Sequence, residues 1–498
     1  MTNKLIEEKV DIYQLPRVDE RHKAGEKIEI TIGDLHGNAI KLLYVLIKHG
    51  FALNMTGEHY AILVAIYCLP VQELTRDHLV QFNAILDTLE FNTQSLLRLL
   101  GDELSDRGNN DYFTLKIFEK LGQHGVPFEI LVSNHGIEFI EASEIREYFL
   151  PRVLADKFTL SMRGLQYLIS KGLVSREEIL ALAKSVYKPA LRAISYTLNA
   201  NFSEITLYSH AGIGLNSIER LARKCNIPFK CESIIDLAIT IERINAVFQG
   251  YVQADKVHIL YTQKQLEEGY ATRDVSYAPF VFLLWNRNYN DLLRPIFYKQ
   301  YMIIFVHGHD SNDPSTEINI VNLNNALGYD ARHFSRGLYN ALYSYNTSVN
   351  NLTIKRFRQT VDHLAAFNTP DKNLKRYTEE FIHQIESSKK QHNLIKLTEL
   401  LEKTCVFLNK ECNSMAFQDY ITGLERESSS GMKILGSLMM MISAQALIAS
   451  LEAGGKKEVV VERERNSLGF FTETVCELES SQADALVIQQ GNDLGRLN

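Results

Sequence analysis

The chain has 498 residues, of which 45% are hydrophobic, 23% are charged and 10% are aromatic. These are ordinary globular values, so collagen-like, disordered and disulfide-scaffold classes are excluded, and the length predicts two or three domains. The 53 basic and 60 acidic residues give a net charge of −7 with no basic stripe, which argues against a nucleic-acid partner. The six cysteines form no CxxC pair, which is typical of a reducing compartment. The N-terminal segment has no apolar h-region, so we expect no signal peptide.

Five short apolar runs along the chain each end in a polar loop. The runs are residues 29–32, 96–100, 128–132, 205–208 and 302–306, and the loops that follow them contain Gly, Ser, Asn and His. Runs of this length and composition predict buried strands. Side chains just past such strands lie where open α/β architectures place their sites. We therefore expect the catalytic core between residues 33 and 309.

Helical signals lie between these runs. Thr75 is placed to cap a helix that carries Leu79 and Phe82, and Ser175 with Glu178 forms a capping-box pattern ahead of an apolar segment.

The composition changes after about residue 350. The last proline is Pro370, and Leu394, Leu397, Leu401 and Leu408 fall on one helix face, so we predict a helical module over residues 350–455. Residues 456–498 read as a polar, acidic tail. The stretch Ile434–Leu451 contains no charged residue, and it is either a buried or partner-binding helix or a short membrane span.

The loops after the five predicted strands contain an ordered set of polar side chains. In chain order these are Asp34, His36, Asp102, Asp106, Arg107, Asn134, His135, His210 and His309. Carboxylates, imidazoles and an amide at strand ends are the donors that two divalent cations with a bridging carboxylate require. Oxygen and imidazole donors without thiolate favour Mn²⁺, Fe or Zn²⁺. Two such cations about 4 Å apart activate water and bind a phosphoryl oxygen.

The motifs resemble those of the calcineurin-like metallophosphoesterases, and most closely those of the phosphoprotein phosphatase branch. They read GDLHG at 33–37, GDELSDRG at 101–108, SNHG at 133–136, HAG at 210–212 and HGH at 307–309. The overall layout also resembles the Wip group of bacterial translocated effector phosphatases. The resemblance implies an α/β fold, a β-sandwich flanked by helices, with a catalytic domain over residues 1–349.

The resemblance also implies a role for each motif residue. Asp34 and His36 would hold one metal, Asp102 would bridge both, and Asn134, His210 and His309 would complete the coordination. Arg107 would bind the substrate phosphate through its bidentate guanidinium, and Arg287, in a Trp-Asn-Arg element, would be a second phosphate ligand. His135 would protonate the leaving oxygen, oriented by Asp106. The implied cofactors are two divalent ions, Mn²⁺ first, with Fe or Zn²⁺ as alternatives.

The chain departs from the family pattern in four respects. Asp106 follows Asp102 one position later than in the family, Ser133 replaces a glycine, and Gly136 replaces an acidic residue. Glu138 is a candidate replacement for that carboxylate. The spacings from Asp34 to Asp102 and from Asn134 to His210 are long, so we predict helical insertions near residues 52–95 and 145–200 that decide access to the site.

The function implied is hydrolysis of phosphate monoesters on Ser, Thr or Tyr by metal-activated water, in an effector that acts on host phosphoproteins. Such a protein would reside in the bacterial cytoplasm before export and be translocated into the host cell, where the helical module would contact a host protein or membrane. Two alternatives stay open. One is a phosphoesterase for dinucleoside polyphosphates or other small molecules, and the other is a metal-binding interaction scaffold with weak catalysis.

Overall fold

The computed structural model describes residues 3–19, 28–152, 159–199, 202–262, 278–310, 318–329 and 334–345, and parts of the chain beyond residue 360. The chain divides into two compact units, residues 1–355 and 356–498. All predicted site residues belong to the first unit.

The first unit contains two principal sheets, and the five predicted strands are confirmed within them. The six-stranded sheet has the order β1 (Asn3–Asp11), β13 (Arg336–Tyr345), β2 (Ile28–Ile32), β5 (Leu96–Leu99), β6 (Phe128–Leu131) and β7 (Leu191–Arg192). The five-stranded sheet has the order β10 (Phe297–Tyr298), β11 (Tyr301–His307), β9 (Glu204–Ser209) and β8 (Ser195–Leu198), with β12 (Ile320–Asn322) beside β11.

The strand directions bring the predicted site loops to shared edges. Strands β2, β5 and β6 run parallel to one another, and β9 runs parallel to β11. Their carboxyl ends therefore lead into the motif loops on the same side of each sheet. The edge strand β1 and its neighbour β13 are antiparallel and carry no motif.

A mixed apolar and polar core joins the two sheets. One buried cluster contains Leu131 and Leu342 from the first sheet and Tyr208 and Ile304 from the second. Arg98, on β5, is fully buried. Its charge is balanced by Glu29 and Glu129, and its guanidinium carbon lies 3.9 Å from the centre of the Tyr208 ring. The hydroxyls of Ser195 and Thr197, on β8, donate to Glu129 and Glu29, so directional contacts as well as apolar packing fix the two sheets to each other.

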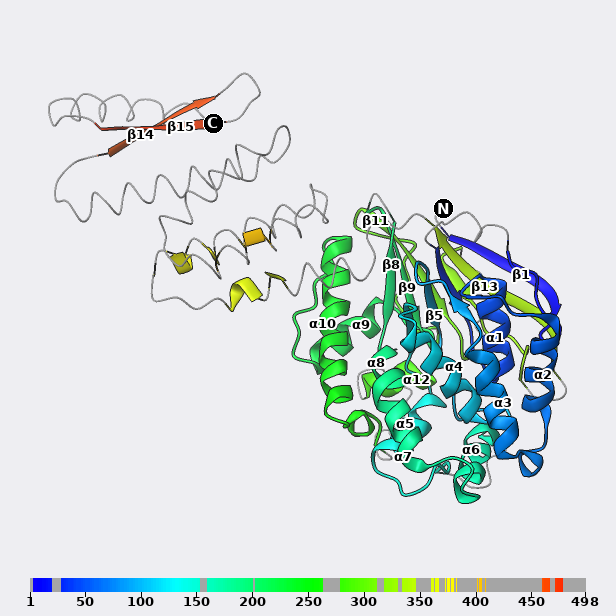
Figure 1. Ribbon diagram of the computed structural model, residues 1–498. Coiled ribbons are helices and arrows are strands. Elements are labelled where there is room, and N and C mark those ends of the chain that lie inside the picture. Colours follow the sequence, from blue (N-terminus) through cyan, green and yellow to red (C-terminus); the bar gives the residue numbers. More distant parts are fainter. Residues whose placement is uncertain are drawn as a thin grey trace. The chain divides into compact units, whose positions relative to one another are not determined.

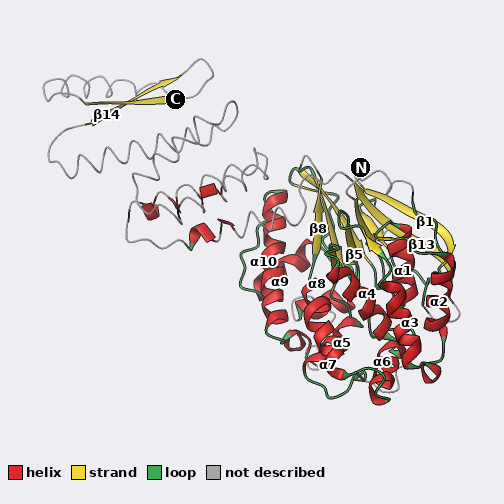
Figure 2. Ribbon diagram, viewed as in Figure 1, coloured by secondary structure: helices red, strands yellow, loops and turns green. Residues whose placement is uncertain are grey.

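Helices surround these strands, and Figures 1 and 2 show them gathered below the strands in the first unit. They are α1 (Ala39–Lys48), α2 (Gly57–Cys68), α3 (Arg76–Leu86), α4 (Asp111–Gln123), α5 (Gly136–Glu144), α6 (Leu160–Ser170), α7 (Arg176–Leu182), α8 (Lys188–Ala190), α9 (Leu215–Lys224), α10 (Ile234–Gln253) and α12 (Pro279–Trp285). Shorter elements are β3 (Ala52–Leu53), β4 (Glu90–Phe91), η2 (Val71–Glu73), η3 (Ala183–Tyr187) and η4 (Val257–Tyr261).

Both helix starts predicted from capping residues are confirmed. Thr75 caps α3, and its hydroxyl accepts a hydrogen bond from the His78 amide. Ser175 caps α7 by accepting from the Glu178 amide. Helices α2 and α3 lie within residues 52–95, and α6 and α7 lie within residues 145–200.

The second unit is described in parts. The described residues between 360 and 408 are helical except for a turn at residue 366. Strands β14 (Val459–Arg465) and β15 (Phe471–Glu477) pair antiparallel, inside the segment that the sequence analysis assigned to a polar tail. The stretch Ile434–Leu451 lies outside the described residues, so the three-part division of the chain stays a prediction. Within the described residues, no helix combines the length and apolarity needed to cross a membrane.

Candidate active site

Side chains from three of the five motif loops form two overlapping clusters that could each hold a metal ion. One cluster is Asp34, Asp102 and His210, and the other is His36, Asp102 and Asp106. In each, one ligand atom per residue lies within 4.8 Å of the others, and all five residues are buried. Asp102 belongs to both clusters, which is the arrangement that a bridging carboxylate requires.

Strained backbone conformations concentrate at this site. His36, Asp102 and His309 all have left-handed backbone torsions, with φ of 58°, 52° and 65°. Each such non-glycine residue costs on the order of 1–3 kcal/mol, and the conformation persists where the surrounding structure enforces it. Three of the predicted ligands therefore have backbone conformations whose cost is offset by contacts with the surrounding structure.

Backbone hydrogen bonds interlock the first two motifs. The Gly37 amide donates to the Asp102 carbonyl at 2.8 Å, and the Gly108 amide donates to the His36 carbonyl at 2.8 Å. A Cβ atom on Gly108 would lie 1.7 Å from the Gly37 carbonyl oxygen, so no other residue fits at this crossing. The positions of His36 and Asp102 are thus set together.

Acceptor atoms around His210 converge on one space. His210 Nδ1 lies 2.8 Å from the Leu100 carbonyl oxygen and donates its proton there, which leaves the lone pair on Nε2. Nε2 lies 2.7 Å from Asn134 Oδ1 and 3.6 Å from Asp102 Oδ1. Three acceptors that face one another without a proton between them fit a cation at their centre.

His309 completes this side of the site. Its amide donates to both carboxylate oxygens of Asp34, at 3.1 and 3.0 Å, and its ring centre lies 4.9 Å from that of His210. Burial, together with the charges of His210 and Arg287, holds the pKa of His309 well below its usual value, so the ring stays neutral. Within the described part of the chain, His309 Nε2 and Asp102 Oδ1 are buried without a hydrogen-bond partner.

The donor atoms at this site fit divalent metal ions. Burial, followed by the charge of Asp102, raises the pKa of Asp34, and the opposing effects of His210 and His36 offset this only in part. Orphaned acceptors and crowded carboxylates are unfavourable in a buried site unless a cation occupies it. Asp34, His36, Asp102, Asn134, His210 and His309 would hold one or both ions.

Asp106 connects the metal cluster to His135. Its Oδ2 lies 3.1 Å from Nδ1 of His36, and its Oδ1 lies 3.5 Å from Nε2 of His135. Burial acts to raise the pKa of Asp106, but the charge of His135 and the hydrogen bond from His36 lower it overall. The second nitrogen of His36 contacts the Asn325 carbonyl oxygen at 2.8 Å. Asp106 is therefore an ionised carboxylate between two imidazoles.

His135 is placed as a proton donor. Its Nδ1 donates to the Ser105 carbonyl at 2.9 Å, which leaves Nε2 to face the site. Burial acts to lower the pKa of His135, but the charges of Asp106 and Asp102 raise it overall. Because 3.5 Å is long for a hydrogen bond, the Nε2 proton is not committed to Asp106.

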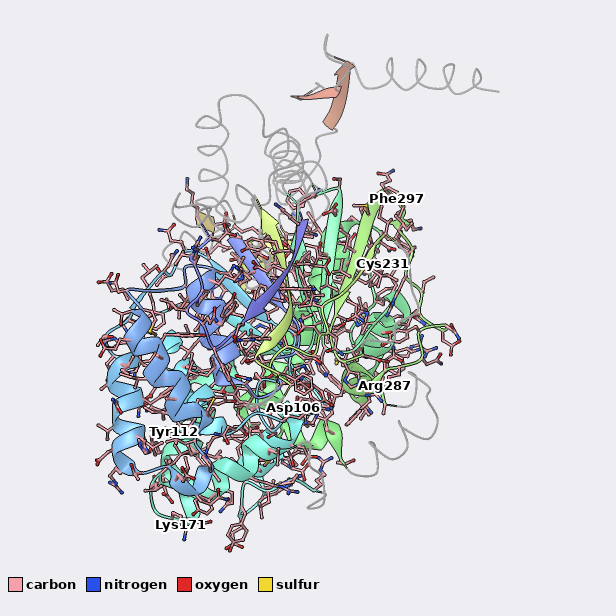
Figure 3. The ribbon with its side chains drawn as sticks, turned by 90° about the vertical axis from the view of Figure 1, so that its right-hand side faces the viewer. Asp106, Tyr112, Lys171, Cys231, Arg287 and Phe297 are labelled. Atoms are coloured by element: carbon pink, nitrogen blue, oxygen red, sulfur yellow. The ribbon has the colours of Figure 1, made fainter. Side chains whose placement is uncertain are left out.

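The two arginines differ in their surroundings. Arg107 Nη1 contacts both carboxylate oxygens of Asp106, at 2.9 and 3.1 Å, and its guanidinium carbon lies 3.8 Å from the centre of the Tyr329 ring. Arg287 follows α12, is 56% exposed, and its Nε lies 3.9 Å from Oδ2 of Asp310, the residue after His309. Figure 3 shows Asp106 and Arg287 at the same level of the first unit. The structure brings Arg107 into the cluster and leaves Arg287 beside it.

Two residues that contact the site, Lys41 and Tyr329, were not predicted from the sequence. Lys41 is buried on α1, and its Nζ donates to the carbonyls of Asp34 (2.6 Å) and Leu327 (2.8 Å). Burial lowers the pKa of Lys41 to about 8. Its only sequence signal is a lysine inside an otherwise apolar helix segment. Tyr329, which packs on Arg107 and edge-on to His36 at 5.2 Å, has no sequence signal.

Glu103 explains the glycine at position 136. A Cβ atom on Gly136 would lie 3.0 Å from Glu103 Oε1 and 2.9 Å from the Tyr187 hydroxyl, which donates to that same oxygen at 2.5 Å. Burial raises the pKa of Glu103 to about 8. The carboxyl of Glu103 thus fills the space where the family's acidic side chain would begin, whereas Glu138 forms ion pairs with Arg146.

Comparisons with known proteins show which family the chain resembles. The family model described as "WipA-like, phosphatase domain" matches residues 96–329. The chain is also similar to the phosphatase domain from the Legionella effector WipB, whose crystal structure is known. The two share 38% sequence identity with a TM-score of 0.53, and the match covers 57% of this chain and 99% of that one. No curated protein matches the sequence.

Proposed function

The chain belongs to the family of WipA-like phosphatases, and from that premise we propose that it is a metal-dependent phosphoprotein phosphatase that hydrolyses phosphate monoesters. The single observation that carries this proposal is the pair of ligand clusters that share Asp102. We further propose that the two sheets form the calcineurin-like β-sandwich of that superfamily.

Two divalent cations, with Mn²⁺ the first choice, would supply a nucleophile at neutral pH and neutralise charge on the phosphoryl oxygens. The protein's own groups then bind and orient the substrate. Arg107 presents its guanidinium from the cluster edge, held flat against Tyr329, and a planar fork matches the geometry of a phosphate. Arg287 is exposed beside the site, and it would exchange its 3.9 Å contact with Asp310 for a second phosphate oxygen.

Proton delivery is assigned to His135. The charges of Asp106 and Asp102 raise the pKa of His135 and so favour its imidazolium form, and the backbone bond from Nδ1 directs Nε2 toward the site. A protonated Nε2 donates to the leaving oxygen, which then departs as an alcohol. Asp106 stabilises the imidazolium without taking its proton, since its own pKa is lowered.

The effector role is proposed from the similarity to the WipB domain. The WipB domain belongs to a Legionella effector, and we propose that this chain is likewise exported from a bacterium to act on host phosphoproteins. The helical module predicted over residues 350–455 is proposed to contact a host protein or membrane.

A substrate panel tests the proposal. Purified protein is assayed with Mn²⁺, Fe²⁺ or Zn²⁺ against phosphoserine, phosphothreonine and phosphotyrosine peptides and against diadenosine tetraphosphate. We expect turnover of phosphopeptides that is lost in Asp102→Asn. Cleavage of the dinucleotide alone would replace the proposal with a small-molecule phosphoesterase. Equal inactivity of wild type and Asp102→Asn with metal still bound would indicate an interaction scaffold.

A further inference from the structure

The loop between Asp102 and Gly108 needs support from outside itself. It contains one residue more than the family pattern, and both Asp102 and Ser105 adopt left-handed backbone torsions, with φ of 52° and 58°. Non-glycine residues in this conformation persist only where neighbouring contacts enforce it. The Asp102 amide donates to Ser133 Oγ at 2.9 Å, and the Ser105 amide donates to the Asp111 carboxylate at 3.1 and 3.0 Å. The two insertions add further contacts at Asp106, at Asn109 and at Gly37 of the first motif.

Helix α2, in the first insertion, reaches the loop through Tyr67. This side chain is fully buried, and its hydroxyl donates to the Gly37 carbonyl at 3.2 Å and accepts from the Asn109 amide at 3.0 Å. Gly37 follows His36 in the first motif, and Asn109 follows Gly108 in the second. One hydroxyl therefore joins the two motifs that carry the ligand clusters.

Asn109 also forms side-chain hydrogen bonds with the C-terminal end of helix α2. Its side-chain amide donates to the Tyr67 carbonyl and to the Leu69 carbonyl, the latter at 2.8 Å. Carbonyls at the end of a helix have no partner within the helix, so these bonds satisfy groups that burial would otherwise leave unpaired. The end of α2 and the second motif are thus bound reciprocally.

Helix α6, in the second insertion, holds the other side of the loop. The Ser161 amide donates to the Asp106 carbonyl at 3.0 Å. A Cβ atom on Gly164 would lie 2.3 Å from the Asn109 carbonyl oxygen, so α6 packs directly against the loop backbone. Asp106 and Asn109 are each fixed from an insertion helix.

We propose that Tyr67 is a positioning residue for the phosphatase reaction, and that its hydroxyl sets the placement of Asp106 relative to His36 and His135. This inference rests on the proposed function. It assigns the insertions a part in assembling the site, beyond the control of access that the sequence analysis predicted. No contact between Tyr67 and substrate is involved.

The test compares Tyr67→Phe with a matched control, Tyr112→Phe. Tyr112 lies on α4, where its hydroxyl accepts from Asn83 Nδ2 at 2.8 Å, so the control also removes one buried hydroxyl that joins an insertion helix to the core. Figure 3 shows Tyr112 to the left of Asp106. Tyr67→Phe removes two buried hydrogen bonds and Tyr112→Phe removes one, but only Tyr67→Phe acts on the motif loops.

The first readout is the dependence of kcat on the leaving group. p-Nitrophenolate departs without a proton, whereas phenolate benefits from one, so a misplaced general acid slows phenyl phosphate more than p-nitrophenyl phosphate. We expect Tyr67→Phe to lower kcat about tenfold for phenyl phosphate and about twofold for p-nitrophenyl phosphate, with KM unchanged, as the loss of two hydrogen bonds allows. Tyr112→Phe should change neither value.

The second readout is hydrogen exchange in metal-free protein. We expect peptides that cover residues 101–110 to exchange about fivefold faster in Tyr67→Phe and at the wild-type rate in Tyr112→Phe. Equal losses for both esters, equal effects of the two variants, or unchanged exchange at 101–110 would overturn the inference. If wild-type protein binds Mn²⁺ but cleaves no ester, the proposed function fails, and the exchange result alone decides whether Tyr67 holds the two motifs.

Discussion

A single methyl group placed at Gly308 tests whether Asp34 lies in a metal site. A Cβ atom at this position would lie 2.2 Å from Asp34 Oδ1. The backbone cannot easily retreat, because the Gly308 amide donates to the His210 carbonyl at 2.9 Å and its carbonyl accepts from the Asp310 amide at 2.8 Å. Gly308 is not among the residues with positive φ, so alanine adds a collision without backbone strain.

The size of the effect follows from the distance. A Cβ atom essentially never approaches another heavy atom within 3.0 Å, so the Asp34 carboxylate must move by about 1 Å. That carboxylate is already fixed by the His309 amide, and the move changes its distances to Asp102 and His210. A misplacement of about 1 Å in a reacting geometry costs about a hundredfold in rate.

Calorimetric titration with Mn²⁺ and turnover of p-nitrophenyl phosphate measure the outcome. We expect Gly308→Ala to bind Mn²⁺ more weakly and to lose about a hundredfold in kcat. The matched control is Gly250→Ala on α10, where a Cβ atom meets nothing within 4 Å. It should keep full turnover and gain up to about 1 kcal/mol in unfolding free energy, since alanine favours a helix. Wild-type binding and turnover in Gly308→Ala would refute the assignment of Asp34.

Three further predictions concern the acid, a buried carboxyl and the second unit. His135→Ala should keep its Mn²⁺ in a calorimetric titration while phosphopeptide turnover falls on the order of 10²–10⁴-fold, and loss of metal would make His135 a ligand instead. The folded state holds the Glu103 proton up to about pH 8, whereas unfolded Glu releases it near 4.5, so the stability of metal-free protein should fall as pH rises between these values. Urea unfolding at pH 5 and pH 9 should show this fall in wild type and a flatter profile in Glu103→Gln. Truncation near residue 350 should leave turnover intact and change cellular location or partner choice in a localisation assay, and an inactive or insoluble fragment contradicts separate units.

The strands and the helix caps were predictable because their causes are local. Apolar runs bounded by Gly, Ser or Asn determine where strands β2, β5, β6, β9 and β11 form. A hydroxyl at Thr75 or Ser175 satisfies an amide three residues later, so these helix starts are visible within four residues.

The consequences of the departures from the family motifs needed the structure. The extra residue in the second motif is absorbed by Ser105, whose left-handed backbone lets Asp106 still face His36 and His135. The space beside Gly136 is occupied by the carboxyl of Glu103, which comes from a different loop. Neither solution has a signature in the local sequence, since each depends on which loop packs beside which.

The sequence by itself determined which side chains follow each strand, and those residue types already limited the chemistry to hard or borderline metal ions and phosphate. Only the tertiary structure decided that Asp102 is shared by two clusters, that Tyr67 ties the first two motifs together, and that Lys41 lies beneath Asp34. The reason is the sequence separation over which the interactions act. Periodicity and capping act over a few residues, whereas the contact between Asp34 and His309 spans 275 positions and exists only once the two sheets have packed.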